Sequence, residues 1–519
     1  MEEFLRPLHV DTELVRKLSL EFFSTFKSLA AESSAQFLPT PISESVLRRS
    51  DGRDRGRYLA IDIGGTNLRA GFIELQPEDE ADLGATNTNG SNGVPSGGPA
   101  PDSPRLRRLL EQSWPIGEHL KNENAEGLFL WIGRHVASVV REGCAVFGLD
   151  PAAELPLGVT FSFPMVQRSL HEATLMPMGK GFAITSELDL GSHLLRGYEA
   201  ARDSSLPRIR VAAIANDAVA TLVSFVYQFR AGRHQKAAMG LICGTGCNAT
   251  IPLRLSSLHG DKRPQAVSVL PGQTGDDDVR IAVNTEWSIN GSAGPLRRLG
   301  LVSRWDEELD AAGEVPGFQP LEYMTAGRYL GELGRIILLD YMTTILGLPG
   351  KVFPAGIRRR YGLTTTFLSH YRPSEAESLL EKLTREFPPD EASSFSWTEP
   401  IADALYQIAQ AIELRAAGIV AASTVGLLAC AEELQLSGSS EPAAPESPAK
   451  ELVVGYTGGC IVHFQDYLID CQRFLDSTTI SALSDDGKDP VRVLLSPCHD
   501  GGITGAGILV PASLASHET

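Results

Sequence analysis

The chain has 519 residues, of which 43% are hydrophobic and 21% are charged, so it can bury a sizeable core spread over two or three domains. Its formal net charge of -18 repels phosphate backbones, which argues against nucleic acid as a partner but allows a small anionic ligand held by backbone N–H groups and a metal. The seven cysteines, without a CxxC pair, fit a reducing compartment, and the acidic N-terminus lacks the apolar run of a signal peptide or membrane span. We therefore expect a cytoplasmic protein with no membrane partner, and the oligomeric state stays open.

The N-terminal part of the chain combines a helix with a hairpin. Apolar residues at helical spacing predict an amphipathic helix over 10–32, and residues 58–76 read as two strands joined by a glycine turn. Two segments, 84–104 and 437–450, are rich in Gly, Ser and Pro and have few apolar residues to bury. We expect both to be disordered insertions, because structured patterns resume on either side.

Two long helices are expected further along the chain. One runs from about Glu322 to about Leu346, and the other from about Ile401 to about Ala429. Core packing accounts for most of their apolar residues. The recurrence of strands, glycine turns and helices favours an α/β protein whose ligands bind at strand ends.

Three glycine motifs lie far apart in sequence. They are Asp62-Ile63-Gly64-Gly65-Thr66-Asn67, Gly244-Thr245-Gly246-Cys247-Asn248 and the C-terminal stretch from Asp500 to Gly507. Glycine lets backbone N–H groups approach phosphate oxygens, and a carboxylate at a strand end can hold Mg²⁺ directly or through water. One such motif is mostly just a turn, but two strand–turn units with Thr and a nearby acid indicate a cleft between two similar domains. Cys243 and Cys247 have a spacing that zinc could use, yet no second pair accompanies them.

The motifs together resemble those of the hexokinase family. LAIDIGGTNLRAGFIEL resembles its first phosphate motif, LGVTFSFPMVQ its sugar signature, AIANDAVATL its catalytic loop and LICGTGCNATI its second phosphate motif; VNTEW and LEYMTAGRYLGELGRIILL resemble further sugar-binding segments. They occur in the family's order over about 58–507. The resemblance implies an α/β fold of two actin-like (RNase H-like) ATPase domains around a sugar/ATP cleft. The small domain would comprise 58–215 plus 500–519, and the large domain 1–57 plus 216–499.

The resemblance also implies residue roles. Asp217 would be the catalytic base, because the 6-hydroxyl of a sugar is a poor nucleophile until its proton is taken, and Lys180 would assist. The alternative for Asn216 and Asp217 is a helix cap, and Glu286 or Glu322 could be solvated or capping acids. The implied sugar contacts are Ser162, Lys180, Asn216, Asp217, Asn248, Glu286 and Glu322. The implied ATP contacts are Asp62, Gly64, Gly65, Thr66, Asn67, Arg69, Gly244, Thr245, Gly246, Gly458 and Gly505, with Asp62 holding Mg²⁺ through water.

Some positions depart from the family pattern. Members that act on glucose carry Trp-Thr-Lys-Gly-Phe where this chain has Met178-Gly179-Lys180-Gly181-Phe182, so a hydroxyl is lost and space is opened. At the position of the family's adenosine motif this chain has Thr457-Gly458-Gly459, so the resemblance does not predict how this side of the site binds the nucleotide. These features resemble a divergent fungal branch that contains N-acetylglucosamine kinases. We therefore expect ATP-dependent phosphorylation of the 6-hydroxyl of N-acetylglucosamine; the alternatives are a glucose or hexose kinase and a non-catalytic, sugar-sensing regulator.

Overall fold

The computed structural model describes most of the chain. The described residues are 1–47, 55–76, 105–117, 119–120, 125–176, 188–264, 267, 279–391, 393–436, 449–483 and 491–516. The segment 84–104, nearly all of 437–450, and the loop with Gly179 and Lys180 lie outside them. The predictions made for these parts of the sequence stay predictions.

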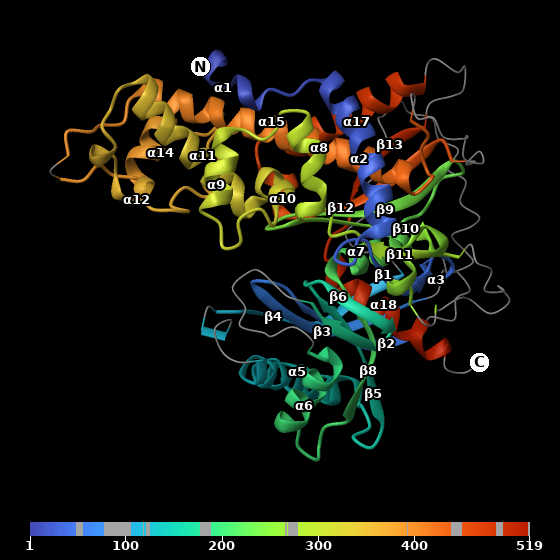
Figure 1. Ribbon diagram of the computed structural model, residues 1–519. Coiled ribbons are helices and arrows are strands. Elements are labelled where there is room, and N and C mark those ends of the chain that lie inside the picture. The colour runs from blue at the N-terminus through green and yellow to red at the C-terminus, as the bar shows by residue number, and fades with distance from the viewer. Residues whose placement is uncertain are drawn as a thin grey trace, which may run out of the picture.

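A mixed five-stranded sheet forms the lower lobe in Figure 1. In the order β4-β3-β2-β5-β8, the sheet joins β4 (Leu106–Pro115), β3 (Asn67–Leu75), β2 (Gly56–Ile63), β5 (Glu154–Phe161) and β8 (Arg208–Ala215). The strands β2, β3 and β4 are antiparallel neighbours, whereas β5 and β8 run parallel to β2. The helices α5 (Ala125–Phe147) and α6 (Leu190–Ala201) pack together on this lobe, and β6 (Met165–Ser169) pairs with β7 (Glu172–Leu175) beside it. The predicted hairpin over 58–76 is confirmed.

The second sheet repeats the topology of the first. In the order β1-β11-β10-β9-β12-β13, it joins β1 (Leu38–Ser43), β11 (Arg280–Asn284), β10 (Cys247–Arg254), β9 (Gln235–Cys243), β12 (Glu451–Thr457) and β13 (Arg492–Pro497). Apart from β1, each sheet has its first strand in the centre, a hairpin partner and a third strand on one side, and two parallel strands on the other. The first two glycine motifs are thus equivalent turns, each joining the first strand of a sheet to the second. The predicted α/β fold of two similar domains is confirmed.

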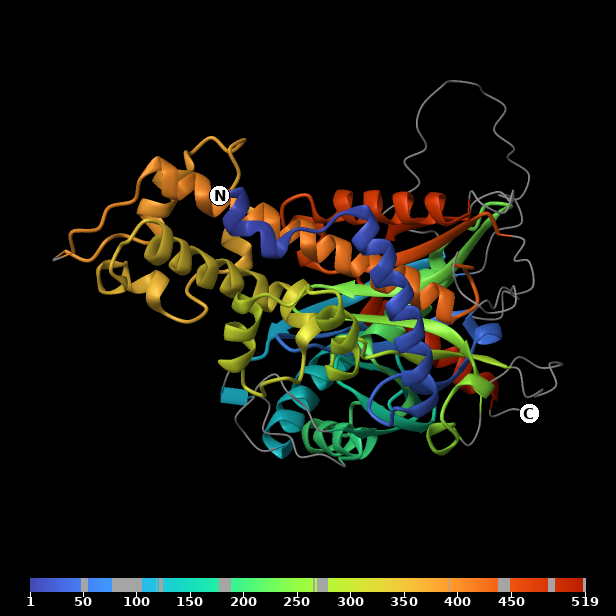
Figure 2. The same ribbon diagram turned by 45° about the horizontal axis from the view of Figure 1, so that its top comes forward.

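Helices cover the large sheet and extend beyond it. They are α1 (Glu2–Leu5), α2 (Thr12–Glu32), α3 (Glu44–Leu47), α8 (Ala293–Arg298), α9 (Arg304–Ala311), α10 (Pro320–Thr325), α11 (Gly327–Asp340), α12 (Ala355–Arg358), α13 (Thr365–Ser369), α14 (Leu379–Glu386), α15 (Glu399–Cys430), α16 (Gly459–His463) and α17 (Tyr467–Leu483). Figure 2 shows α2 crossing α15, and these two helices and α17 pack against each other in the core. The predicted helices over 10–32 and 401–429 are confirmed. By length and composition α15 could cross a membrane, contrary to the sequence-based expectation, yet 89% of its most apolar window is buried inside the protein.

The long helix predicted from Glu322 to Leu346 is wrong, because the chain breaks it at Ala326. There the backbone is extended, with φ -103° and ψ 147°. The N–H groups of Gly327 and Arg328 donate to the carbonyl oxygens of Gly244 and Thr245, at 2.8 and 3.2 Å, instead of bonding within a continuous helix. The break therefore attaches the start of α11 to the second glycine turn.

Two helices lie between the sheets, as Figure 1 shows near its centre. α18 (Gly501–Ser516) packs on β2, β5 and β8 of the small sheet and against α7 (Asp217–Gln228), which packs on β9 of the large sheet. The C-terminal glycine motif therefore begins a helix rather than forming a turn. Its glycines allow close approach: a Cβ at Gly505 would lie 2.2 Å from the Ala220 carbonyl oxygen. The exact domain boundaries stay a prediction.

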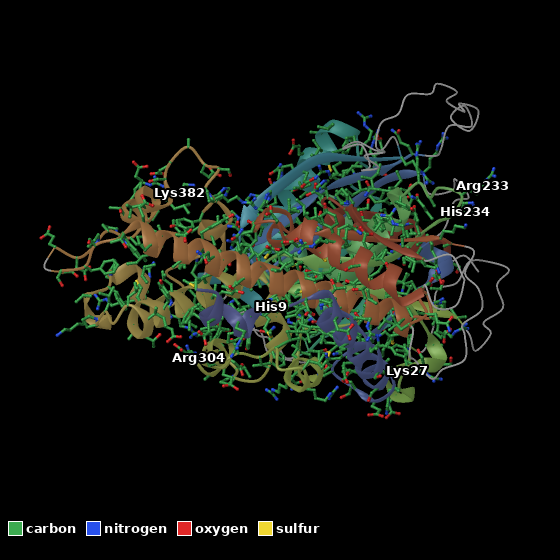
Figure 3. The ribbon with its side chains drawn as sticks, turned by 90° about the horizontal axis from the view of Figure 1, so that it is seen from above. His9, Lys27, Arg233, His234, Arg304 and Lys382 are labelled. Carbon is green, nitrogen blue, oxygen red and sulfur yellow. The ribbon has the colours of Figure 1, made fainter. Side chains whose placement is uncertain are left out.

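Charged side chains are spread over the surface. Figure 3 shows the labelled basic groups His9, Lys27, Arg233 and Lys382 well apart from one another in the view from above.

Candidate active site

A cavity of about 490 Å³ lies between the two glycine turns. Both sheets contribute to it, since residues following β2, β5 and β8 face residues from β9, β10 and the segment after β11. The predicted site residues that line it are Gly65, Thr66, Ser162, Asn216, Asp217, Thr245, Gly246, Asn248, Glu286 and Glu322. The structure thus brings together every predicted sugar contact that it describes.

Asp217 occupies the first position of α7 because Asn216 caps that helix. The Asn216 side-chain oxygen accepts from the Ala218 N–H at 2.9 Å, and its amide donates to the Phe163 carbonyl oxygen at 3.3 Å. The Asp217 carboxylate accepts from the same Ala218 N–H at 3.0 Å. The capping alternative is therefore correct for Asn216, and the cap also fixes the Asp217 carboxylate at the cavity wall. A carboxylate held this way can accept a proton from a bound hydroxyl.

Amides and a carboxylate form a network on the large-domain side. The Asn248 amide donates to Asn284 Oδ1 at 2.8 Å and to Glu286 Oε1 at 3.2 Å, and the Asn284 amide donates to the same Glu286 oxygen at 2.9 Å. Glu286 has a φ of 45°, a left-handed conformation that non-glycine residues rarely adopt. Its backbone oxygen accepts from the Gln36 amide at 2.9 Å, which helps to hold it. Strained backbone of this kind clusters at functional sites, where it aims a side chain.

Glu322 is buried at the other end of this wall. Its Oε2 accepts from the Cys247 N–H at 3.2 Å and from the Ser288 hydroxyl at 3.3 Å. The side chain is only 6% exposed, so it is not a solvated acid. A Cβ at Gly246 would lie 2.9 Å from the same oxygen, which explains the glycine there. Carboxylates and amides can pair with sugar hydroxyls, which both donate and accept.

The first glycine turn carries the predicted metal residue Asp62. Burial raises the pKa of Asp62 to about 7; Arg69 acts in the opposite direction, while Asp217 and Asp500 raise the pKa further. This concentration of negative charge fits a divalent cation. No three acidic, His or Cys side chains within the described ranges lie close enough to ligate a metal. A single carboxylate would hold Mg²⁺ mainly through bound water, so Asp62 is compatible with the role given to it in the sequence analysis, and that role stays a prediction.

Several predicted nucleotide contacts lie outside the cavity. Arg69 forms an ion pair with Asp500 at 2.8 Å, and Arg108 binds the other oxygen of that carboxylate at 2.6 Å. Gly64 closes the first turn, its N–H donating to the Asn67 carbonyl oxygen at 2.9 Å. Gly505 lies in the contact between α18 and α7 and lines neither this cavity nor the second one.

A second cavity of about 580 Å³ lies beyond the second glycine turn. Gly244 and Thr245 line it, together with Tyr361, His370 and Gly459. Gly458 adjoins it with a φ of 121°, and a Cβ there would lie 2.3 Å from the Cys243 carbonyl oxygen. Glycine is thus required at 458, whatever its role toward a nucleotide. Hydroxyl, imidazole and aromatic groups around a glycine turn suit a nucleoside.

Sequence reasoning missed four polar residues of the first cavity. Ser288, Gln319 and Arg328 line the cavity, and Ser288 also supports Glu322, whereas Asn284 does not line the cavity and supports Glu286. Asn284 and Arg328 lie inside the VNTEW and LEYMTAGRYLGELGRIILL segments, and Ser288 and Gln319 lie close to them, which was the available signal. Their roles depend on the break at Ala326 and on the turn after β11, which periodicity does not reveal.

Comparisons with known proteins agree with this geometry. Models of the hexokinase family match residues 1–227 and 238–512. Rat Hexokinase-3 is 30% identical over 431 residues, covering 82% of this chain and 40% of that protein, and tobacco Hexokinase-1 is 26% identical over 466 residues, covering 89% and 80%. The chain therefore spans about 40% of the length of the mammalian relatives. A solved hexokinase from Schistosoma mansoni, complexed with glucose, superposes with a TM-score of 0.72 at 22% identity and covers 99% of this chain and 98% of that one, which shows a shared fold.

Proposed function

Because the chain belongs to the hexokinase family, we propose that it transfers the terminal phosphate of ATP to the 6-hydroxyl of a hexose. One observation carries the proposal: a single cavity between the glycine turns gathers Asp217 with the amides and carboxylates of Asn216, Asn248, Glu286 and Glu322. Asp217 would take the hydroxyl proton while the polar wall holds the ring. Mg²⁺ at Asp62 would neutralise phosphate charge when bound.

The test of this chemistry is Asp217→Asn, which keeps the shape of the side chain and removes the base. We expect turnover to fall at least ~10²-fold, the low end for general-base catalysis, while sugar affinity changes little. Turnover would be followed by coupled ADP release and affinity by calorimetry. Glu307→Gln, on an acid of α9 that is not among the residues lining either cavity, is a matched control. Near-normal turnover in Asp217→Asn would refute the assignment of the base.

The sugar itself is the finer part of the proposal. The relatives reported above are named hexokinases, and the Schistosoma protein is complexed with glucose, which supports a plain hexose. The assignment of N-acetylglucosamine as the substrate rests on Gly179, where the loss of a threonine side chain would make room for an acetamido group. Side-by-side assays with glucose, fructose, mannose and N-acetylglucosamine decide between them. If none is phosphorylated although sugar binds, the chain is a sugar-sensing regulator.

The variant Gly179→Thr probes the origin of sugar selectivity. We expect it to shift the ratio of kcat/KM toward glucose by roughly 5- to 150-fold, because a hydrogen bond is worth about 1–3 kcal/mol and the added side chain would crowd the acetamido group. Equal loss for both sugars would make Gly179 a residue of loop conformation only.

We also propose that the protein acts in the cytosol. The support is chemical: all seven cysteines have free thiols, as is usual in a reducing compartment. Fluorescent tagging followed by fractionation would test this, and enrichment with membranes or nuclei would contradict it.

A further inference from the structure

A lysine outside both cavities holds the end of α2. The Lys262 ammonium group donates to the carbonyl oxygens of Ser33 and Gln36 at 2.6 and 2.9 Å, and to that of Leu29 at 3.5 Å. Leu29 belongs to the last turn of α2, and the other two residues follow that helix. Burial lowers the pKa of Lys262 to about 8, because the surrounding protein disfavours the charged ammonium group. A cation at this place binds carbonyl groups that a helix leaves free at its C-terminus.

The segment 33–36 connects this lysine to the sugar cavity. The Ser33 hydroxyl accepts from the N–H groups of Ala35 and Gln36, at 3.2 and 3.1 Å, so the segment folds into a tight turn. Ala35 lines the cavity between the two glycine turns. The Gln36 side-chain amide donates to the Glu286 carbonyl oxygen at 2.9 Å. The turn therefore lies between Lys262 on one side and the backbone of Glu286 on the other.

Glu286 needs this support from its neighbours. Its φ of 45° is unfavourable for a residue with a side chain, and such a conformation persists only when the surrounding structure holds it. Two amides of the cavity wall hold its carboxylate, whereas the Gln36 amide holds its backbone. The Gln36 amide is itself confined, since its oxygen lies so close to Gly291 that no Cβ would fit there. A displacement of the segment 33–36 would therefore release the backbone of Glu286.

We propose that Lys262 is a positioning residue of the sugar site, which holds the segment 33–36 in place and so keeps the Glu286 carboxylate aimed into the cavity. The inference rests on the proposed function for the identity of the ligand as a sugar. Lys262 does not line the cavity, so it acts through Gln36 and not on the substrate. The alternative is a lysine that only caps α2, which would stabilise the fold and leave sugar binding unaffected.

The test measures sugar binding to the full chain by calorimetry. Glucose is the probe, or N-acetylglucosamine if the wild type binds only that sugar. Lys262→Met keeps an unbranched side chain and removes the ammonium group. We expect it to raise the Kd and the KM for sugar roughly 5- to 150-fold, the factor that corresponds to the cost of one strained backbone residue. The KM for ATP and the kcat at saturating sugar should stay within about twofold, because bound sugar restores the aim of Glu286.

Two further variants separate positioning from capping. Gln36→Met removes the amide donor, so Lys262→Met should add little to the Kd for sugar in that background while it still lowers the melting temperature. Lys262→Arg keeps a cation with several donors and should recover part of the affinity. Arg263→Met is the matched control, since the guanidinium of this neighbouring residue also binds carbonyl oxygens, those of Leu258 and Ser256, and none of the segment 33–36.

Several outcomes would overturn the inference. A lower melting temperature in Lys262→Met with an unchanged Kd for sugar would show a helix cap only. Additive effects of Lys262→Met and Gln36→Met on the Kd, or an equal loss of affinity in Arg263→Met, would also contradict it. If Lys262→Met does not fold, Lys262→Arg and Gln36→Met decide, and wild-type sugar affinity in both would overturn it.

Failure of the proposed function would look different. A wild type that binds a sugar without phosphorylating it, with binding weakened in Lys262→Met, would refute the kinase and leave this inference intact. A wild type that phosphorylates a sugar, with the same Kd for that sugar in Lys262→Met, would do the reverse. A wild type that binds neither sugar would overturn both.

Discussion

Gly502 packs so closely against Asp62 that the structure leaves no room for a side chain at position 502. A Cβ at this position would lie 2.4 Å from Asp62 Oδ2 and 2.7 Å from its Cγ, whereas ordinary contact begins at 3.4 Å. In Gly502→Ala the carboxylate must therefore move by about 1 Å, the difference between 3.4 and 2.4 Å. The Asp62 backbone cannot follow, because β2 is paired to β3 and β5 on its two sides. The side chain must leave its rotamer instead.

Two energies oppose each other in this variant. Overpacking of a filled contact costs about 1–3 kcal/mol, whereas replacing glycine by alanine in a helix returns up to about 1 kcal/mol. We expect a net loss of roughly 0–3 kcal/mol, with a melting temperature a few degrees lower. Turnover should fall far more, by about 10²-fold, because a misplacement of about 1 Å at the reacting centre can cost that much.

A double-mutant cycle isolates the contact. In an Asp62→Ala background the clash has no partner, so Gly502→Ala should become neutral or slightly stabilising, with a coupling of about 1–3 kcal/mol. Thermal unfolding of the four proteins measures it. If Gly502→Ala destabilises the Asp62→Ala protein as much as the wild type, the contact with Asp62 is not the cause and the reasoning fails.

Three other perturbations test separate parts of the structure. The pKa of Asp62 is raised from below 4 to about 7, so the folded state holds a proton that the unfolded state loses, and the wild type loses stability as pH rises from about 4 to 7. With a chelator present, Asp62→Asn should therefore have a higher melting temperature than the wild type at pH 8 and nearly the same one at pH 5. An equal gain at both pH values would refute the shift. Asn216→Ala removes the cap of α7 and should cost about 0.5–2 kcal/mol together with turnover, whereas Ser378→Ala, which removes the cap of α14, a helix that lines neither cavity, should cost stability alone. Deleting 84–104 should change neither melting temperature nor activity. The Gln76 N–H donates to the Arg105 carbonyl oxygen, with 2.9 Å between nitrogen and oxygen, so a shorter connection can join the two ends. Loss of activity in a folded deletion protein would contradict this.

The sequence was sufficient for the features that depend on local chemistry. Glycine turns after apolar strands predicted both phosphate-type turns, and the Asn-Asp pair predicted a capped helix that presents Asp217. Helix periodicity predicted α2, and a stretch rich in Ala, Ile and Leu predicted α15, which is buried along most of its length. These elements can be predicted because the residues that determine them are neighbours in the sequence.

Features that depend on distant contacts were not predictable in the same way. The C-terminal glycines looked like a turn, but they begin α18, where Asp62 and α7 come too close to Gly502 and Gly505 to admit side chains. Arg69 forms an ion pair with Asp500, which lies 431 residues later in the chain, and a contact of Arg69 with the nucleotide stays a prediction. No local pattern states which distant surface a glycine or an arginine will meet.

The break at Ala326 depends on a distant contact, although it lies in a segment whose local sequence favours a helix. A continuous helix from 322 to 346 would satisfy its own backbone groups and leave the second glycine turn without its partners. Instead the N–H groups of Gly327 and Arg328 bind that turn, which sets Glu322 on the sugar side and Arg328 at the junction with the second cavity. Movement of the turn on nucleotide binding must therefore move both side chains, because they flank the same two hydrogen bonds. We therefore predict that sugar lowers the Kd for MgADP in the wild type. Ala326→Pro removes the Ala326 N–H that donates to the Glu322 carbonyl oxygen and forces φ from -103° toward about -65°, so it should reduce this effect of sugar, measured by calorimetry. An equal effect of sugar in both proteins would show that the break serves packing only.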